Sequence, residues 1–136
     1  MSIGVVIVTH YRLGEEFLQA LRLIVPEAPE FRAVSIDPSQ SVEEMRDDIS
    51  IALGAADRGD GVLVLTDMFG GTPSNLAISL LEPGKVEVIA GINLPMLIKL
   101  AEARSKADLD SLARMGVDAG KRYIAIASSV LEGVSK

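Results

Sequence analysis

Short runs of β-branched residues alternate along the chain with segments in which apolar residues recur at helical spacing. The β-branched runs cover residues 3–8, 31–36, 62–66 and 86–90, and each is bounded by Gly, Pro, Asp or Asn. The first and third runs are apolar on both faces, as the central strands of a parallel sheet must be. The alternation therefore predicts four strands, two of them central.

The intervals between these runs carry the pattern of amphipathic helices. Apolar residues mark one helix from Leu13 to Ile24, and a capping box at residues 41–44 fixes the start of a second. Two more open at Thr72-Pro73 and Asn93-Leu94-Pro95, where the missing N–H of proline costs nothing, and a fifth covers about residues 108–119. Residues 121–131 fit either a strand or a helix face, because periodicity does not separate the two.

This order of elements, with connections of a few residues, predicts an α/β fold with right-handed crossovers. We expect an open, mainly parallel sheet of strand order 2-1-3-4 with helices on both faces. The chain has 136 residues, 49% of them hydrophobic, which is the size and composition of a single domain over residues 1–136.

The composition excludes several classes of function. With no cysteine and one histidine, His10, the chain has no thiolate ligand and no pair of imidazoles; we expect neither a metal nor a cofactor. A net charge of −6 without a Lys and Arg cluster, and 4% aromatic residues, argue against nucleic-acid binding. The apolar start is too short for a membrane span and no basic region precedes it, which predicts a cytoplasmic protein.

The one histidine falls where parallel sheets bind ligands, at the carboxyl ends of strands beside the point where strand order reverses. In the order 2-1-3-4 that point lies between the first and third strands, which end in Thr9-His10 and Asp67-Met68. We expect Asp67 to hold Nδ1–H of the imidazole, leaving the Nε2 lone pair as an outward nucleophile or base. The alternative is a surface histidine near an ordinary strand-end aspartate.

The loop after Asp67 is a glycine turn that leads into a helix. At residues 70–75, free backbone amides and the positive end of the helix dipole favour an anion, and Thr72 and Ser74 add hydroxyl donors. Beside a nucleophilic imidazole, this arrangement indicates that the histidine accepts a phosphoryl group. The alternative is a plain turn with Thr72 as N-cap, since no phosphate-loop motif is present.

Three more residues border this end of the sheet. Met68 and Phe69 suit the docking of another protein if they are exposed; alternatively, both fold back beneath the loop into the core. Asn93 either forms the outer wall of the site or only caps the helix that follows it. The sequence leaves both choices open.

Three motifs are separated along the chain: Gly4-Val5-Val6-Ile7-Val8-Thr9-His10, Thr66-Asp67-Met68-Phe69-Gly70-Gly71-Thr72-Pro73-Ser74-Asn75 and Val88-Ile89-Ala90-Gly91-Ile92-Asn93-Leu94-Pro95-Met96-Leu97. In this order they resemble the mannose-family IIA component of the bacterial phosphoenolpyruvate:sugar phosphotransferase system. The match runs in register over essentially the whole chain.

The resemblance implies a phosphocarrier and phosphotransferase. His10 would be phosphorylated on Nε2 by phospho-HPr, Asp67 would orient its Nδ1 side, and the phosphoryl group would pass to a histidine of a separate IIB protein. The phosphoryl- and partner-binding residues expected around this pair are Thr9, Met68, Phe69, Gly71, Thr72, Ser74 and Asn93. Contact with the membrane would be indirect, through a permease complex.

The resemblance also implies a fifth, antiparallel strand at residues 122–127, exchanged between the subunits of a homodimer. Tyr11-Arg12 departs from the residues often found after the family's histidine, and this departure bears on the partner rather than on the chemistry.

Two other functions would use the same residues. One is a stand-alone regulatory phosphoprotein, in which a protein partner reads the phosphorylation state of His10. The other is a noncovalent small-anion-binding module at the same end of the sheet, which would not become phosphorylated.

Overall fold

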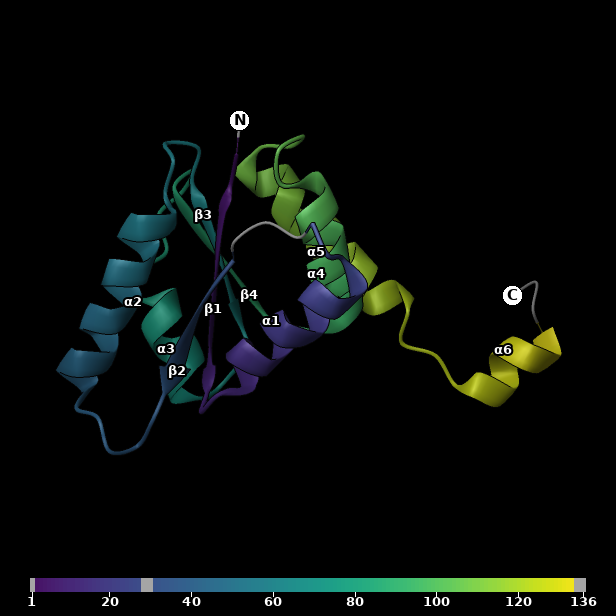
Figure 1. The fold of residues 1–136 in the computed structure, drawn as a ribbon, viewed down its shortest axis with the longest axis horizontal. Coiled ribbons are helices and arrows are strands. Elements are labelled where there is room, and N and C mark those ends of the chain that lie inside the picture. The colour runs from purple at the N-terminus through teal and green to yellow at the C-terminus, as the bar shows by residue number, and fades with distance from the viewer. Residues whose placement is uncertain (1, 28–30, 134–136) are drawn as a thin grey trace.

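The computed structural model describes residues 2–27 and 31–133, in which strands and helices alternate in the predicted order (Figure 1). All four predicted strands and all five predicted helices are present, followed by one more helix. The elements are β1 (Gly4–His10), α1 (Leu13–Ile24), β2 (Arg32–Ile36), α2 (Val42–Ala56), β3 (Val62–Thr66), α3 (Thr72–Ile78), β4 (Val86–Ala90), α4 (Leu94–Ala103), α5 (Leu109–Arg122) and α6 (Ala127–Gly133).

The four strands form one parallel sheet in the order β2-β1-β3-β4, which confirms the predicted order. β1 pairs with β3 from Gly4↔Val62 to Val8↔Thr66, so the carboxyl ends of these strands lie next to each other. All of β3 is buried, and so is β1 until its last residue, His10. The centre of the sheet therefore brings His10 and the residue after Thr66 to the same edge.

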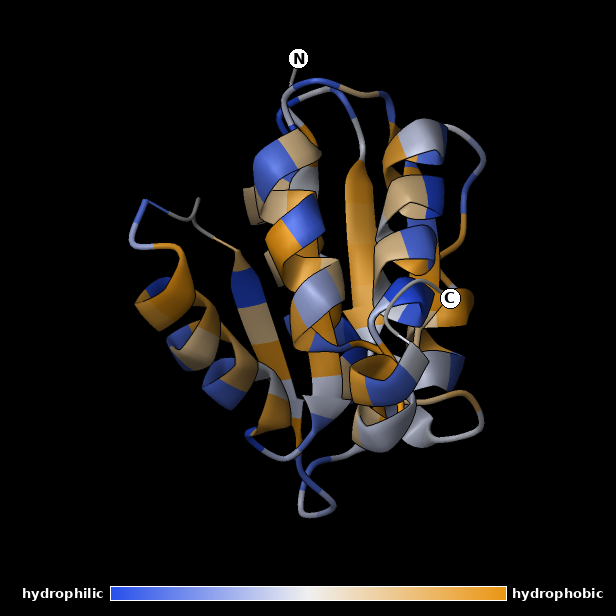
Figure 2. Cartoon of the chain, turned by 90° about the vertical axis from the view of Figure 1, so that its right-hand side faces the viewer, coloured by the Kyte–Doolittle hydropathy of each residue, from blue (hydrophilic) through white to orange (hydrophobic). Residues whose placement is uncertain are grey.

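A layer of helices covers each face of the sheet. Helices α1, α4 and α5 pack on the face toward which Val5 and Ile7 point, and α2 and α3 pack on the face of Val6 and Val8. Figure 2 shows the apolar sheet between helices that turn hydrophilic residues outward. Each large side chain buried in this way contributes about 1.5–3 kcal/mol, which holds the strand ends in fixed positions.

The helices begin where local side chains satisfy their free amides. Ser41 Oγ accepts the N–H of Glu44 at 3.1 Å and Glu44 Oε1 accepts the N–H of Ser41 at 2.8 Å, which is the predicted capping box of α2. Among the described residues, no helix has the length and apolar character needed to cross a membrane.

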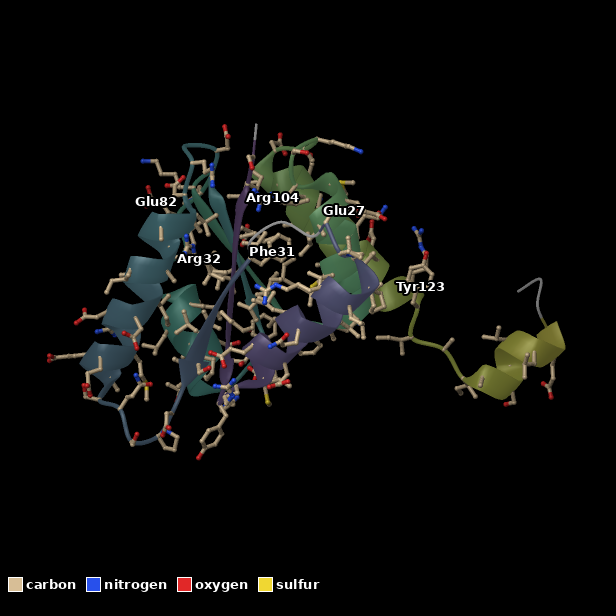
Figure 3. The ribbon with its side chains drawn as sticks, viewed as in Figure 1. Glu27, Phe31, Arg32, Glu82, Arg104 and Tyr123 are labelled. Atoms are coloured by element: carbon tan, nitrogen blue, oxygen red, sulfur yellow. The ribbon has the colours of Figure 1, made fainter. Side chains whose placement is uncertain are left out.

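The C-terminal strand expected at residues 122–127 is not formed in the single chain. Arg122 is the last residue of α5, Ala127 is the first of α6, and the link between them is irregular. A strand needs a neighbour to take its backbone hydrogen bonds, whereas this segment follows α5 and runs away from the other elements after Tyr123, labelled in Figure 3. Residues 127–131, which fit either pattern, are helical here.

Candidate functional site

His10 and Asp67 meet at the carboxyl edge of the sheet. The Nδ1 atom of His10 lies 2.8 Å from Oδ2 of Asp67, and the same oxygen accepts the backbone N–H of His10 at 3.0 Å. The second oxygen, Oδ1, accepts the N–H of Met68 at 3.1 Å. The predicted approach of the two side chains is confirmed, and three hydrogen bonds fix the carboxyl group.

These hydrogen bonds determine the charge of Asp67. Burial by itself raises the pKa of this carboxyl group, but the amide of His10, its ring hydrogen bond and its charge together lower the pKa below the ordinary value. An ionised carboxylate only accepts hydrogen bonds, so Nδ1 of His10 carries a proton and donates it. In the neutral ring this tautomer leaves a lone pair on Nε2.

The Nε2 side of the ring is turned toward solvent and toward Gly71. The His10 side chain is 48% exposed, and its Nε2 has no hydrogen-bond partner among residues 2–27 and 31–133. A Cβ atom added to Gly71 would lie 2.8 Å from Cε1 and 3.2 Å from Nε2. Because Gly71 has no side chain, the imidazole ring of His10 fits beside the start of α3.

Ser74 lies inside this loop and supports it. Its side chain is fully buried, its Oγ donates to the carbonyl of Met68, and it is 2.5 Å from the hydroxyl of Thr66. Because the Ser74 proton goes to Met68, the Thr66 hydroxyl is the donor to Ser74. The structure thus places the Ser74 side chain under the loop as a support, whereas the sequence predicts a residue that contacts the phosphoryl group or the partner.

Thr9 also faces inward. It is fully buried, and its Oγ1 accepts the N–H of Gly14 at 2.8 Å and donates to the carbonyl of Tyr11 at 3.4 Å. These bonds shape the turn from β1 into α1, so the Thr9 hydroxyl is directed away from the exposed face of the ring.

Three of the other predicted residues are at the surface near the ring. Met68 is 54% exposed and Phe69 is 70% exposed, so they do not fold back into the core. Thr72, the first residue of α3, is also exposed, and Gly71 rather than Thr72 is its N-cap. We call these three residues, Met68, Phe69 and Thr72, the docking rim.

Asn93 has a structural role in the described chain. Its Oδ1 accepts the N–H of Met96 at 3.0 Å, which caps α4, and its Nδ2 donates to the carbonyl of Gly120 at 2.9 Å. Both polar ends of the side chain are therefore already bonded. Of the two alternatives for Asn93, the capping role is the one observed.

The backbone of Tyr11 was not anticipated from the sequence. Its φ of 48° is in the left-handed region, where a bulky residue is uncommon. Its N–H donates to the carbonyl of Ile36 at 2.9 Å, and its own carbonyl accepts from Thr9. These bonds hold the sharp turn directly after His10, and no local pattern in a single sequence predicts a left-handed tyrosine.

Comparison with known proteins places this geometry in a family. Residues 4–116 match the family model described as the fructose IIA component of the PTS system. The chain belongs to the IIA components of the sugar phosphotransferase system. Proteins of this family take part in phosphoryl transfer, and the motif that ends at His10 and the loop after Asp67 both lie within the matched residues.

Three relatives give the extent of the likeness for this IIA component. It is 31% identical over 126 residues to the mannose-specific EIIAB component of Escherichia coli K12, covering 91% of this chain but only 39% of that protein. It is 31% identical over 98 residues to the sorbose-specific EIIA component of Lacticaseibacillus casei, covering 71% of this chain and 70% of the relative. The solved mannose/sorbose specific IIA subunit of Enterococcus faecalis shares 29% identity with a TM-score of 0.82, covering 93% and 95% of the two chains.

Proposed function

We propose that this IIA component carries a phosphoryl group on Nε2 of His10, taking it from phospho-HPr and passing it to a histidine of a IIB protein. The observation that carries the proposal is the hydrogen bond of 2.8 Å between Nδ1 of His10 and ionised Asp67, which directs the free lone pair to the exposed side. The cytoplasmic location expected from the sequence is part of this proposal.

The transfer needs no proton movement at the reacting nitrogen. The Nε2 lone pair attacks phosphorus in line with the P–N bond of the donor, that bond breaks, and its electron pair returns to the donor imidazole. The His10 ring then carries positive charge with Nδ1 still protonated, and the carboxylate of Asp67 stabilises that charge as it develops. The reverse sequence, with an acceptor imidazole as nucleophile, releases the group to IIB.

The docking rim favours a protein as the donor and as the acceptor of the phosphoryl group. Met68 and Phe69 are large apolar side chains exposed in the loop directly after Asp67, and aromatic and Met residues are enriched at protein interfaces. A partner that covers the rim brings its own phosphohistidine to the unobstructed side of the ring.

The homodimer with an exchanged strand also belongs to this proposal. Strand β4 is an open edge of the sheet, and a groove between β4 and α5 is lined by Phe69, Val88, Ala113 and Val117 among others. The apolar side chains of Ile124 and Ile126, 75% and 72% exposed, suit this groove on a second subunit. Pairing with β4 would supply the neighbour that residues 122–127 lack in one chain.

Labelling with radioactive phosphoenolpyruvate, enzyme I and HPr tests the proposal. We expect acid-labile phosphate on the wild-type chain and none on His10→Ala, whose melting temperature should be close to that of the wild type because the side chain is exposed. Label on the His10→Ala variant would refute the assignment. Addition of a IIB protein should then remove the label; a label that stays would favour the regulatory alternative.

A further inference from the structure

Three arginine side chains line one small cavity at the end of the sheet opposite His10. The cavity has a volume of about 170 Å³ and is lined by Gly4, Arg32, Ala55, Ala56, Arg58 and Arg104; we call it the arginine cavity. Arg32 begins β2, Arg58 follows the end of α2, and Arg104 caps the end of α4. Figure 3 shows Arg32 and Arg104 in the half of the molecule that contains the N-terminus in Figure 1.

These charges have no carboxylate partners among residues 2–27 and 31–133. Arg32 and Arg58 make no hydrogen bond or ion pair there, whereas Arg104 donates to Ser2 Oγ at 2.8 Å and lies over the Phe31 ring, 5.9 Å from its centroid. Asp57 and Asp60, which flank Arg58 in the sequence, accept the backbone N–H groups of Gly59 and Ser2. In a chain of net charge −6, three arginines line one cavity without a carboxylate to balance their charge.

The repulsion between these groups is not relieved by loss of a proton. Burial, and then the like charge of Arg58, lower the pKa of Arg104, yet a guanidinium remains protonated in proteins at physiological pH. Lysines in the same place could become neutral, whereas the arginines keep their charge, so a bound anion would lower the repulsion between them.

We propose that the arginine cavity binds a small phosphate-type oxyanion. Each guanidinium presents a planar fork of donors that matches phosphate oxygens, and forks from three elements surround a tetrahedral, multiply charged anion. The volume is below the roughly 300 Å³ at which pockets for drug-sized ligands begin, so the ligand is inorganic phosphate or the phosphate end of a small phosphomonoester.

A purely structural role for these arginines would have a visible signature. Cations after the ends of α2 and α4 can bond the free carbonyl groups there and compensate the helix dipoles. No bond from Arg32, Arg58 or Arg104 to a helix-end carbonyl is present in the described part of the chain; Arg104 has structural contacts with Ser2 and Phe31, whereas Arg32 and Arg58 have none. At the end of α2, the backbone of Gly4 packs closely against the backbone of Ala56. A Cβ atom added to Gly4 would lie 2.3 Å from the carbonyl oxygen of Ala56.

The arginine cavity is separate from the phosphocarrier site. Gly4 and His10 are the first and last residues of β1, and the rise of a strand puts them about 20 Å apart. The proposed anion site can therefore be tested independently of the proposed role of His10.

The test is a titration of the ¹⁵N-labelled full chain with sodium phosphate, against sodium chloride at matched ionic strength. We expect saturable NMR shifts of the amides of Gly4, Ala55 and Ala56, which chloride does not reproduce, in both the wild type and His10→Ala. Arg58→Gln and Arg32→Gln change exposed side chains and should each weaken binding about tenfold or more, since charge-assisted hydrogen bonds are lost. Arg46→Gln, an exposed arginine of α2 outside the cavity, is the matched control and should bind like the wild type.

Glycerol phosphate in a parallel titration distinguishes the two sources of the anion. Binding as tight as that of phosphate identifies a phosphomonoester site, and binding of inorganic phosphate alone identifies a free-phosphate site; both support the proposal. The absence of saturable shifts at the cavity, shifts confined to the surroundings of His10, or equal binding by Arg58→Gln, Arg32→Gln and the wild type would overturn it.

Discussion

His10 depends on two neighbours that act in different ways. Asp67 fixes the tautomer through an ionised carboxylate 2.8 Å from Nδ1, and Gly71 provides the space that the ring occupies. Charge on one side and an absent side chain on the other together orient Nε2.

The variant Asp67→Asn removes the negative charge of this side chain and keeps its shape. An amide of the same size keeps the fold but does not stabilise positive charge on the ring, and it can also hold the other tautomer. We expect phosphoryl transfer to His10 to slow by about tenfold or more, with a melting temperature near that of the wild type, measured by quench-flow labelling and thermal unfolding. A transfer rate equal to the wild-type rate would contradict the role of the carboxylate.

The lowered pKa of Asp67 also predicts how stability depends on pH. Because the folded pKa is below the unfolded value of about 3.9, the carboxylate contributes stability that is fully present above the unfolded pKa. That contribution is lost as the pH falls through the folded pKa. Denaturant unfolding between pH 6 and about 2 should show a smaller decline for Asp67→Asn than for the wild type, and parallel curves would exclude the effect.

Gly71→Ala tests the steric role of the glycine. The backbone of Gly71, at φ −134°, is extended and accepts alanine without strain, so the expected effect comes from the new methyl group against Cε1 of His10. We expect the ring to shift, phosphoryl transfer to fall about tenfold, and the NMR signal of the His10 ring to move. Gly54→Ala, whose new methyl group contacts nothing within 4 Å, is the control and should leave transfer unchanged.

Among the elements, β3 and the start of α3 are joined by buried hydroxyl groups. Thr66, at the end of β3, bonds Ser74 in the first turn of α3, and Ser74 bonds the Met68 carbonyl between them. This network determines where Asp67 and the docking rim lie relative to the sheet.

Ser74→Ala removes the centre of the network. The Thr66 hydroxyl and the Met68 carbonyl then lose a partner in a buried place, at a cost of about 1–3 kcal/mol in the free energy of unfolding. We expect faster amide exchange at residues 67–71 as well. The matched control is Ser79→Ala, which removes a single bond to the Leu76 carbonyl at an exposed residue; an equal loss in both variants would contradict the special role of Ser74.

The elements could be predicted because their causes are local. Alternating β-branched runs and amphipathic helices determine a parallel sheet, and the rule for ligand sites in such sheets then pairs His10 with Asp67 across the switch point. Thr9 and Ser74 point inward because of how the turn after β1 and the short helix α3 are rotated relative to the sheet. The spacing of residues in the sequence does not determine that rotation. Likewise, the contact between Gly71 and His10 depends on the backbone path of a loop.

For the whole molecule, the open edge of β4 and the exposed end of the chain are complementary features. The groove beside β4 is partly apolar, and the backbone of residues 124–126 runs away from the domain (Figure 1), with Ile124 and Ile126 exposed. In the single chain, residues 123–126 are an irregular link between α5 and α6, and the proposed pairing across chains would give them a strand partner; the periodicity of the segment does not separate these structures.

Ile124→Asp combined with Ile126→Asp tests this complementarity. Charged groups in an apolar groove are costly, so we expect light scattering after size exclusion to show a dimer for the wild type and a monomer for the double variant. Leu23→Asp changes an apolar residue of α1 that is 84% exposed and should leave the dimer intact. A wild-type monomer, or a dimer of unchanged stability in the double variant, would rule out exchange through this segment.

The half-exposed position of His10 at the end of a buried strand means that the proposed phosphorylation would change the surface and not the core. With Nδ1 still protonated, a dianionic phosphoryl group on the positively charged ring would change the net charge from −6 to about −7, and the added charge would lie at one edge of the sheet. Donor and acceptor therefore meet carriers that differ in local electrostatic potential while the packing stays the same. Under the proposed function, encounter rates with the two partners would then depend on ionic strength to a different extent before and after transfer.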